Sequence, residues 1–88
     1  MAMHAIYLYG RKGCHLCDDA RTILAGVLGE RSAAGLAIPE VIERDIDTDP
    51  VWQRSFMTTI PVLEIGGGRL ELAVNRGPIR RFIAEHLG

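Results

Sequence analysis

The spacing of apolar positions in the first third of the chain predicts a strand followed by a helix. Residues 5–9 form a short apolar and aromatic run that ends at Gly10, which is typical of a strand buried on both faces inside an α/β sheet. From Cys14 onward the apolar positions recur at helical spacing, and we expect the helix to end at Gly29, with a loop over 32–35. One continuous helix face is formed by Leu16, Ala20, Ile23, Leu24, Val27 and Leu28.

The middle of the chain predicts a second strand and a second helix. Residues 41–46 are rich in β-branched and apolar side chains and form the strand. Asp49 followed by Pro50 predicts a helix start, because aspartate caps the free N–H groups and proline suits the first helical position. The helix then runs through Trp52 and Phe56.

The last third predicts a hairpin and a closing helix. Residues 62–65 form a third strand, 66–68 are three glycines that suit a turn, and 69–73 alternate polar and apolar as a half-buried hairpin partner does. Asn75 is a candidate cap for the last helix, with Pro78 in its first turn. The buried face of that helix comprises Ile79, Phe82, Ile83 and Leu87.

The predicted order is therefore β-α-β-α-β-β-α. Helical connections imply parallel strand pairs at the start, and the glycine turn implies an antiparallel pair at the end. Packing in layers then predicts an α/β fold with a four-stranded mixed sheet and helices on both faces. We expect residues 1–88 to form one domain.

Composition and charge narrow the class of protein. The 88 residues are 48% hydrophobic and 24% charged, which suits a small globular domain. The net charge is −1, so there is no basic surface for nucleic acid, and no apolar run approaches the roughly 20 residues of a membrane span. Residues 1–6 lack the features of a secretory signal. We expect a cytoplasmic monomer.

The candidate chemistry is concentrated in Cys14-His15-Leu16-Cys17, the two cysteines of the chain. The pair lies where a strand loop meets a helix start, whose free N–H groups and partial positive charge stabilise a thiolate. We therefore expect the pKa of Cys14 to fall below about 8.5, the value of a free thiol. The spacing places the two Cα atoms about 5–6 Å apart, within disulfide range. Cys14 should be the exposed nucleophile, and the more buried Cys17 should resolve the mixed disulfide.

Three other interpretations compete with redox chemistry. A structural disulfide would close a very short loop and contribute little stability. A zinc site would need more ligands than one cysteine pair, and of His4, His15 and His86 only His15 is close in sequence. Two idle thiols are the third possibility. The spacing and context favour a redox pair that needs no metal and no cofactor.

The charged neighbours of the cysteines act in both directions. Arg11 and Lys12 favour the thiolate and could attract an anionic thiol partner, or they are solvated loop charges. His15 either adds to this stabilisation when protonated or is exposed without a role. Asp18 and Asp19 oppose the thiolate if they face the sulfurs, but we expect them to complement the helix dipole.

Beyond these patterns, the chain resembles a glutaredoxin or thioredoxin-fold protein over nearly its whole length. In particular it is similar to a small glutaredoxin-like group with Cys-His-Leu-Cys-Asp near the N-terminus. The resemblance rests on Tyr7-Leu8-Tyr9, Arg11 three residues before Cys14, the cysteine pair, Asp45-Ile46-Asp47 and Thr59-Ile60-Pro61-Val62.

The resemblance implies a site and an activity. It implies a cis Ile60–Pro61 bond packed beside the disulfide, with Thr59, Ile60 and Pro61 contacting substrate and the Ile60 backbone offered to a substrate chain. Arg11 stands where glutaredoxins carry a lysine that meets the carboxylate of glutathione. The implied function is a thiol–disulfide oxidoreductase in electron transport and cell redox homeostasis, acting on a disulfide-containing protein or a small thiol.

Two departures from that family pattern bear on the electron donor. Glutaredoxins usually carry Pro-Tyr between the cysteines, where this chain has His15-Leu16. They also carry a Gly-Gly pair after the fourth strand, where this chain has 71–75 without glycine. This disfavours glutathione and favours thioredoxin or a thioredoxin-type reductase as the donor. The alternative function is a non-enzymatic binding module that docks a partner or holds a metal through the cysteines.

Overall fold

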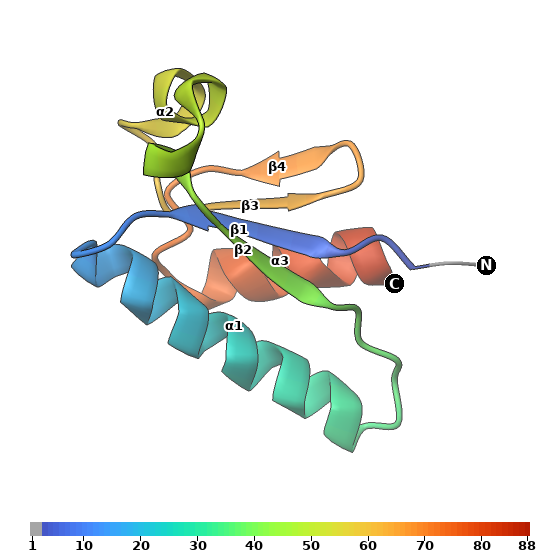
Figure 1. Ribbon diagram of the computed structural model, residues 1–88. Helices are drawn as coiled ribbons and strands as arrows, with labels where there is room; N and C mark the ends of the chain where they lie inside the picture. Colours follow the sequence, from blue (N-terminus) through green and yellow to red (C-terminus); the bar gives the residue numbers. More distant parts are fainter. Residues whose placement is uncertain (1–2) are drawn as a thin grey trace.

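The computed structural model describes residues 3–88 (Figure 1). Its elements are β1 (Ile6–Gly10), α1 (His15–Ala33), β2 (Val41–Asp45), the 3₁₀ turn η1 (Ile46–Thr48), α2 (Pro50–Phe56), β3 (Val62–Ile65), β4 (Gly68–Leu70) and α3 (Arg76–Leu87). The predicted order of strands and helices is confirmed, with η1 in addition. Met1 and Ala2, the start of the stretch that we expect to lack a secretory signal, lie outside the described residues.

The four strands form one mixed sheet in the order β2-β1-β3-β4. β1 and β2 are parallel, whereas β1–β3 and β3–β4 are antiparallel. The expectation of more than one parallel pair was wrong for β3. After α2 the chain enters β3 at the C-terminal end of β1, where Val62 pairs with Tyr9. β3 therefore runs back along β1 in the opposite direction.

The helices cover both faces of the sheet, as predicted (Figure 1). Alternate residues of β1 point to opposite faces, so Ile6 and Leu8 join a main core beneath α1 and α3. Tyr9 joins a smaller core on the α2 side. The main core comprises Ile6, Leu8, Ala20, Leu24, Val27, Leu28, Leu63, Ile65, Ala73, Ile79, Phe82 and Ile83. The smaller core comprises Tyr9, Ile46, Phe56 and Val62, with Tyr7, Trp52 and Ile60 packed against it.

Helix α1 differs from its prediction at both ends. It continues through Gly29 to Ala33, because one exposed glycine costs a helix only about 1 kcal/mol and the added turn bonds Glu30 to α3. Gly35, with φ of 80°, follows the helix end instead. At the start Leu16 is 47% exposed, because Cys17 occupies the core-facing position one residue later.

The hairpin partner of β3 is shorter than predicted, since β4 ends at Leu70. The next residues turn away and bond to the loop before β3. The Leu72 N–H donates to the Thr59 carbonyl (2.9 Å) and the Ala73 N–H to the Pro61 carbonyl (2.8 Å). Leu72 adopts φ of 49° to make this turn. Residues 71–73 therefore support the loop before β3 rather than extending the sheet.

The starts of the last two helices differ in how they are capped. The Asp49 carboxylate accepts the N–H groups of Val51 (2.8 Å) and Trp52 (3.4 Å), as the Asp-Pro signal predicts. Asn75 precedes α3 but makes no capping hydrogen bond with its side chain. Within the described part of the chain, no helix has the length and apolar character needed to cross a membrane.

Candidate active site

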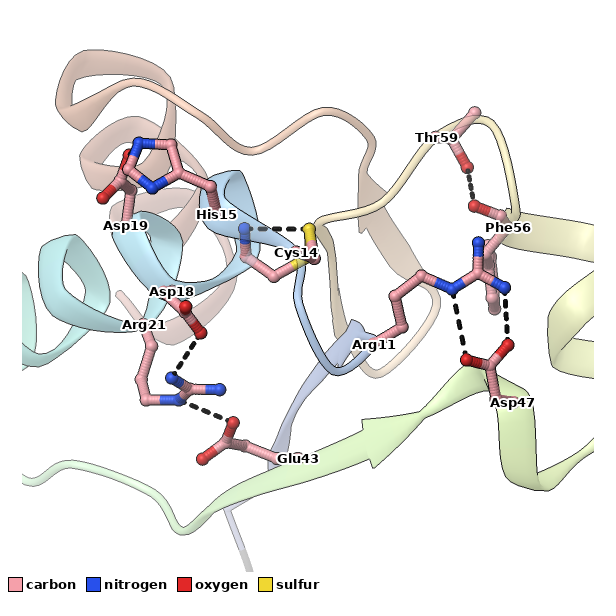
Figure 2. Close-up of a disulfide and its surroundings, with 11 residues drawn as sticks. Arg11, Cys14, His15, Asp18, Asp19, Arg21, Glu43, Asp47, Phe56 and Thr59 are labelled. Carbon is pink, nitrogen blue, oxygen red and sulfur yellow. Dashed lines mark hydrogen bonds and ion pairs between the residues drawn. A yellow bond between two sulfur atoms is a disulfide. The ribbon is translucent and has the colours of Figure 1, made fainter.

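Cys14 lies at the junction of the loop after β1 and the N-terminus of α1 (Figure 2), and Cys17 is in the first turn of that helix. Cys14 is the N-cap of α1, and its Sγ accepts the backbone N–H of Cys17 at 3.1 Å. The pair forms a disulfide with a Cα–Cα distance of 5.2 Å, within the predicted 5–6 Å. A helix N-terminus therefore directs a free N–H group and its partial positive charge at Cys14.

The two cysteines differ in exposure in the predicted sense. Cys14 is half-buried, whereas Cys17 is only 3% exposed. Gly10 makes room for Cys17: a Cβ on Gly10 would lie 3.0 Å from the Cys17 Cβ and 3.1 Å from its Sγ. Sequence reasoning assigned no role to Gly10, because a glycine at a strand end is common and its neighbour here is seven residues away.

Arg11 is held by a carboxylate that sequence reasoning left without a role. Its Nε lies 3.2 Å and its Nη2 2.5 Å from the two oxygens of Asp47, and Figure 2 shows the side chain directed away from Cys14. Hydrogen bonds from Arg11 lower the pKa of Asp47. Lys12 is exposed beside it. The structure thus places Arg11 near the cysteines, but with its guanidinium engaged.

The acidic residues after Cys17 are paired on the surface of α1 (Figure 2). His15 Nε2 lies 3.4 Å from Asp19, with the histidine side chain 86% exposed. Asp18 accepts from Arg21 at 3.0 Å, and Arg21 also bonds Glu43 of β2 at 2.7 Å. His15 is therefore directed along the outside of the helix, and the tuning role predicted for it and for Lys12 stays a prediction.

The loop before β3 contains the cis Ile60–Pro61 bond that the resemblance implies. Its backbone is largely committed within the chain. The N–H groups of Thr59 (2.9 Å) and Ile60 (3.1 Å) both donate to the Phe56 carbonyl, and the carbonyls of Thr59 and Pro61 accept from the segment after β4. The Ile60 carbonyl, between those two, accepts none of the backbone bonds that the described residues make outside the helices and strands.

A cleft of about 450 Å³ lies on the Cys17 side of the disulfide, between the loop after β1 and strand β2, and neither Cys14 nor the loop before β3 lines it. Its lining includes Cys17, Arg11, Lys12, Arg21 and Glu43, so charged groups of both signs surround it. In residues 3–88, no group of three or more His, Cys, Asp or Glu side chains is placed to hold a metal ion. The arrangement can carry thiol–disulfide exchange, with the half-buried Cys14 at a helix start and the Cys17 sulfur within bonding distance.

Comparison with known proteins agrees with this geometry. A family model described as "Glutaredoxin-like domain (DUF836)" matches residues 5–84. No curated protein matches.

Among solved structures, the chain is similar to target protein XcR50 from X. campestris. The X-ray structure of that protein has 25% identity and a TM-score of 0.73, over 91% of this chain and 96% of that one. Its solution structure has 27% identity and a TM-score of 0.69, over 92% and 94%. A malarial protein, at 16% identity and a TM-score of 0.65 over 99% and 100%, shares the fold.

Proposed function

This chain belongs to the glutaredoxin-like domain family (DUF836), has a thioredoxin-like fold, and on that premise we propose that it is a thiol–disulfide oxidoreductase. One observation carries the proposal. The Cys14 Sγ caps α1 and accepts the Cys17 N–H at 3.1 Å, while Cys17 lies one turn into the helix and is buried. A sulfur in that position is stabilised as the thiolate, which is the form that attacks disulfides.

The reaction starts from the reduced protein. The Cys14 thiolate attacks one sulfur of a substrate disulfide, forms a mixed disulfide, and releases the other substrate sulfur as a thiolate that takes up a proton. Cys17 then loses its proton and attacks the Cys14 sulfur. The second substrate thiol leaves, and the Cys14–Cys17 disulfide forms. Two electrons have passed from the protein to the substrate.

Reduction of the Cys14–Cys17 disulfide needs an external dithiol or two thiols. We propose thioredoxin or a thioredoxin-type reductase as the donor rather than glutathione. The substrate backbone is proposed to contact the Ile60 carbonyl beside Thr59 and Pro61. Arg11, which lines the cleft next to Cys17, is proposed to contact the substrate as well. We propose that it acts as a monomer in the cytoplasm, in redox homeostasis and electron transport.

Alkylation of the reduced protein tests the activation of Cys14. The Cys17→Ser variant carries Cys14 as its one thiol, and the Cys14→Ser variant is the matched control with Cys17 alone. We expect Cys14 to react with iodoacetamide near pH 6 at least about tenfold faster than a free thiol of pKa about 8.5, with Cys17 much slower. A Cys14 that reacts no faster than a free thiol would refute the activated nucleophile.

A reduction assay with two donors tests the proposed electron source. The oxidised protein is mixed with thioredoxin and its reductase or with glutathione, and the Cys14–Cys17 redox state is followed by mass after trapping. Faster reduction by thioredoxin is expected, and equal or faster reduction by glutathione contradicts this choice of donor.

Stoichiometric zinc or iron on protein purified under reducing conditions would favour the metal-holding alternative instead.

A further inference from the structure

The ion pair between Arg11 and Asp47 is the feature of the site that the proposed reaction leaves unused. Arg11 precedes Cys14 by three residues, and its carbonyl accepts the Cys14 N–H at 3.3 Å. The Arg11 backbone is therefore fixed one turn from the reactive sulfur. A free guanidinium at this point would attract a thiol that carries a carboxylate.

Asp47 is built into its position by several contacts. It lies in η1, where Ile46 is fully buried in the smaller core. The Asp45 side chain accepts the Asp47 N–H at 2.9 Å, which caps the turn. Gln53 of α2 donates to the Asp47 carboxylate at 3.3 Å, on the same oxygen that Arg11 Nη2 contacts. Donors from the loop after β1 and from α2 thus hold the Asp47 carboxylate.

The other guanidinium groups at the cleft are engaged as well. Arg21 is bonded to Asp18 and Glu43. Arg44 donates to the Tyr9 hydroxyl at 2.8 Å and lies over the Tyr7 ring at 3.9 Å. Lys12, exposed on the same loop, also lines the cleft, so release of Arg11 would add a further positive charge to this side of the disulfide.

We propose that Asp47 is a specificity-determining positioning residue that occupies the Arg11 guanidinium and so discriminates against anionic thiols at the Cys14–Cys17 disulfide. The inference rests on the proposed function, because it concerns which thiols exchange with this disulfide. An uncharged or cationic thiol, or a protein dithiol, needs no free Arg11. A small carboxylate-bearing thiol must compete with Asp47 for it.

The reaction used for the test is reduction of the oxidised protein by a small thiol. One thiolate attacks the Cys14 sulfur and the Cys14–Cys17 bond breaks, with Cys17 leaving as a thiolate that is protonated. A second thiolate then attacks the mixed disulfide, giving the small-molecule disulfide and reduced Cys14. Rates of reduction are measured with 3-mercaptopropionate (anionic), 2-mercaptoethanol (neutral) and cysteamine (cationic). For each thiol the rate of the variant is divided by that of the wild type, so that the intrinsic reactivity of the thiol cancels.

The Asp47→Asn variant should change these ratios selectively. We expect about a three- to tenfold gain with 3-mercaptopropionate at low salt, a change within about 1.5-fold with 2-mercaptoethanol, and a loss with cysteamine. The gain should shrink at high ionic strength, since screening weakens exposed charges. Asp47→Glu keeps a carboxylate and should behave as the wild type.

Two controls separate this effect from a general change in charge or folding. Glu30→Gln removes the same charge near the C-terminal end of α1, where Glu30 pairs with Arg76, and should leave all three ratios near one. The double variant Arg11→Gln/Asp47→Asn should lose the gain, with Lys12 still present. Thermal unfolding confirms that each variant is folded, and Asp47→Ala serves as the second test if Asp47→Asn is not.

Two results would overturn the proposal. The first is an equal gain with all three thiols, which would mean that Asp47 restricts access to the disulfide rather than selecting by charge. The second is no gain with the anionic thiol in a folded variant. Failure of the proposed function is a different result, because it requires that Cys14 itself react no faster than an ordinary thiol.

Discussion

Replacement of Gly10 by alanine tests the packing behind the buried sulfur. The new methyl group would lie 3.0 Å from the Cys17 Cβ and 3.1 Å from its Sγ, which is closer than carbon and sulfur normally approach. Cys17 cannot yield freely, since it is 3% exposed and joined to Cys14. Gly10→Ala should therefore lower the free energy of unfolding.

The size of the loss follows from two opposing effects. Overpacking a well-filled site costs about 1–3 kcal/mol, while the lower entropy of the unfolded alanine variant returns about 0.4–1 kcal/mol. A net loss of about 1–2 kcal/mol corresponds to a fall in Tm of roughly 5–15 °C for a domain of this size.

Gly29→Ala is the matched control, because it makes the same chemical change with the opposite expected sign. Gly29 lies inside α1, and no atom would come within 4 Å of its added Cβ. Alanine is the better helix former, so the variant should gain about 0.5–1 kcal/mol and melt about 2–8 °C higher.

Thermal unfolding followed by circular dichroism, with and without a reductant, measures both variants. In the reduced protein the Cys17 thiol can rotate away from the new methyl group, so the deficit of Gly10→Ala should shrink. If Gly10→Ala melts at or above the wild type while Gly29→Ala is stabilised, the contact between Gly10 and Cys17 is not as tight as the structure shows. A Gly29→Ala variant that melts lower would contradict the length of α1 instead.

Three further predictions concern the core, the buried phenol and the helix caps. Ile83→Ala empties a fully buried position and should lower the free energy of unfolding in urea by about 2–5 kcal/mol. Val51→Ala, at a position 57% exposed, should change it by less than about 0.5 kcal/mol. Similar losses from the two variants would contradict the assigned core. Burial raises the pKa of Tyr9 above its ordinary 10.0. The stability that the neutral Tyr9 phenol contributes is therefore present below pH 10 and lost as the pH rises through the raised pKa. An absorbance titration in which Tyr9→Phe removes no late-ionising phenol would refute this. Asp49→Ala should lower the free energy of unfolding by about 0.5–2 kcal/mol, because it removes a cap that bonds two N–H groups. Asn75→Ala is the control, since it removes no capping bond. An equal loss from both variants would contradict the capping role of Asp49.

Local signals were sufficient for much of the fold. Asp49 and Pro50 mark the start of α2 through chemistry contained in two adjacent residues. The bounds of β3 follow from an apolar run between a proline and three glycines. The cysteine pair was identifiable because its spacing and its position after a strand are both local.

Features that depend on distant parts of the chain were not predictable in this way. Gly29 resembles a helix stop, but contacts between the last turn of α1 and α3 outweigh its small cost. β4 ends early because Leu72 bonds to Thr59, thirteen residues before it. The partner of Arg11 is thirty-six residues away, and no pattern in the sequence joins Arg11 to Asp47.

The unequal cores on the two faces of the sheet have a consequence for spectroscopy. Trp52 is the one tryptophan of the chain, and its ring lies 5.7 Å from that of Tyr9, on the side of the smaller core. Its fluorescence therefore samples the environment of α2, whereas far-ultraviolet dichroism is dominated by α1 and α3. Coincident melting curves from the two signals would mean that a single cooperative transition unfolds both faces. A change in emission at lower temperature would mean that the α2 side unfolds first.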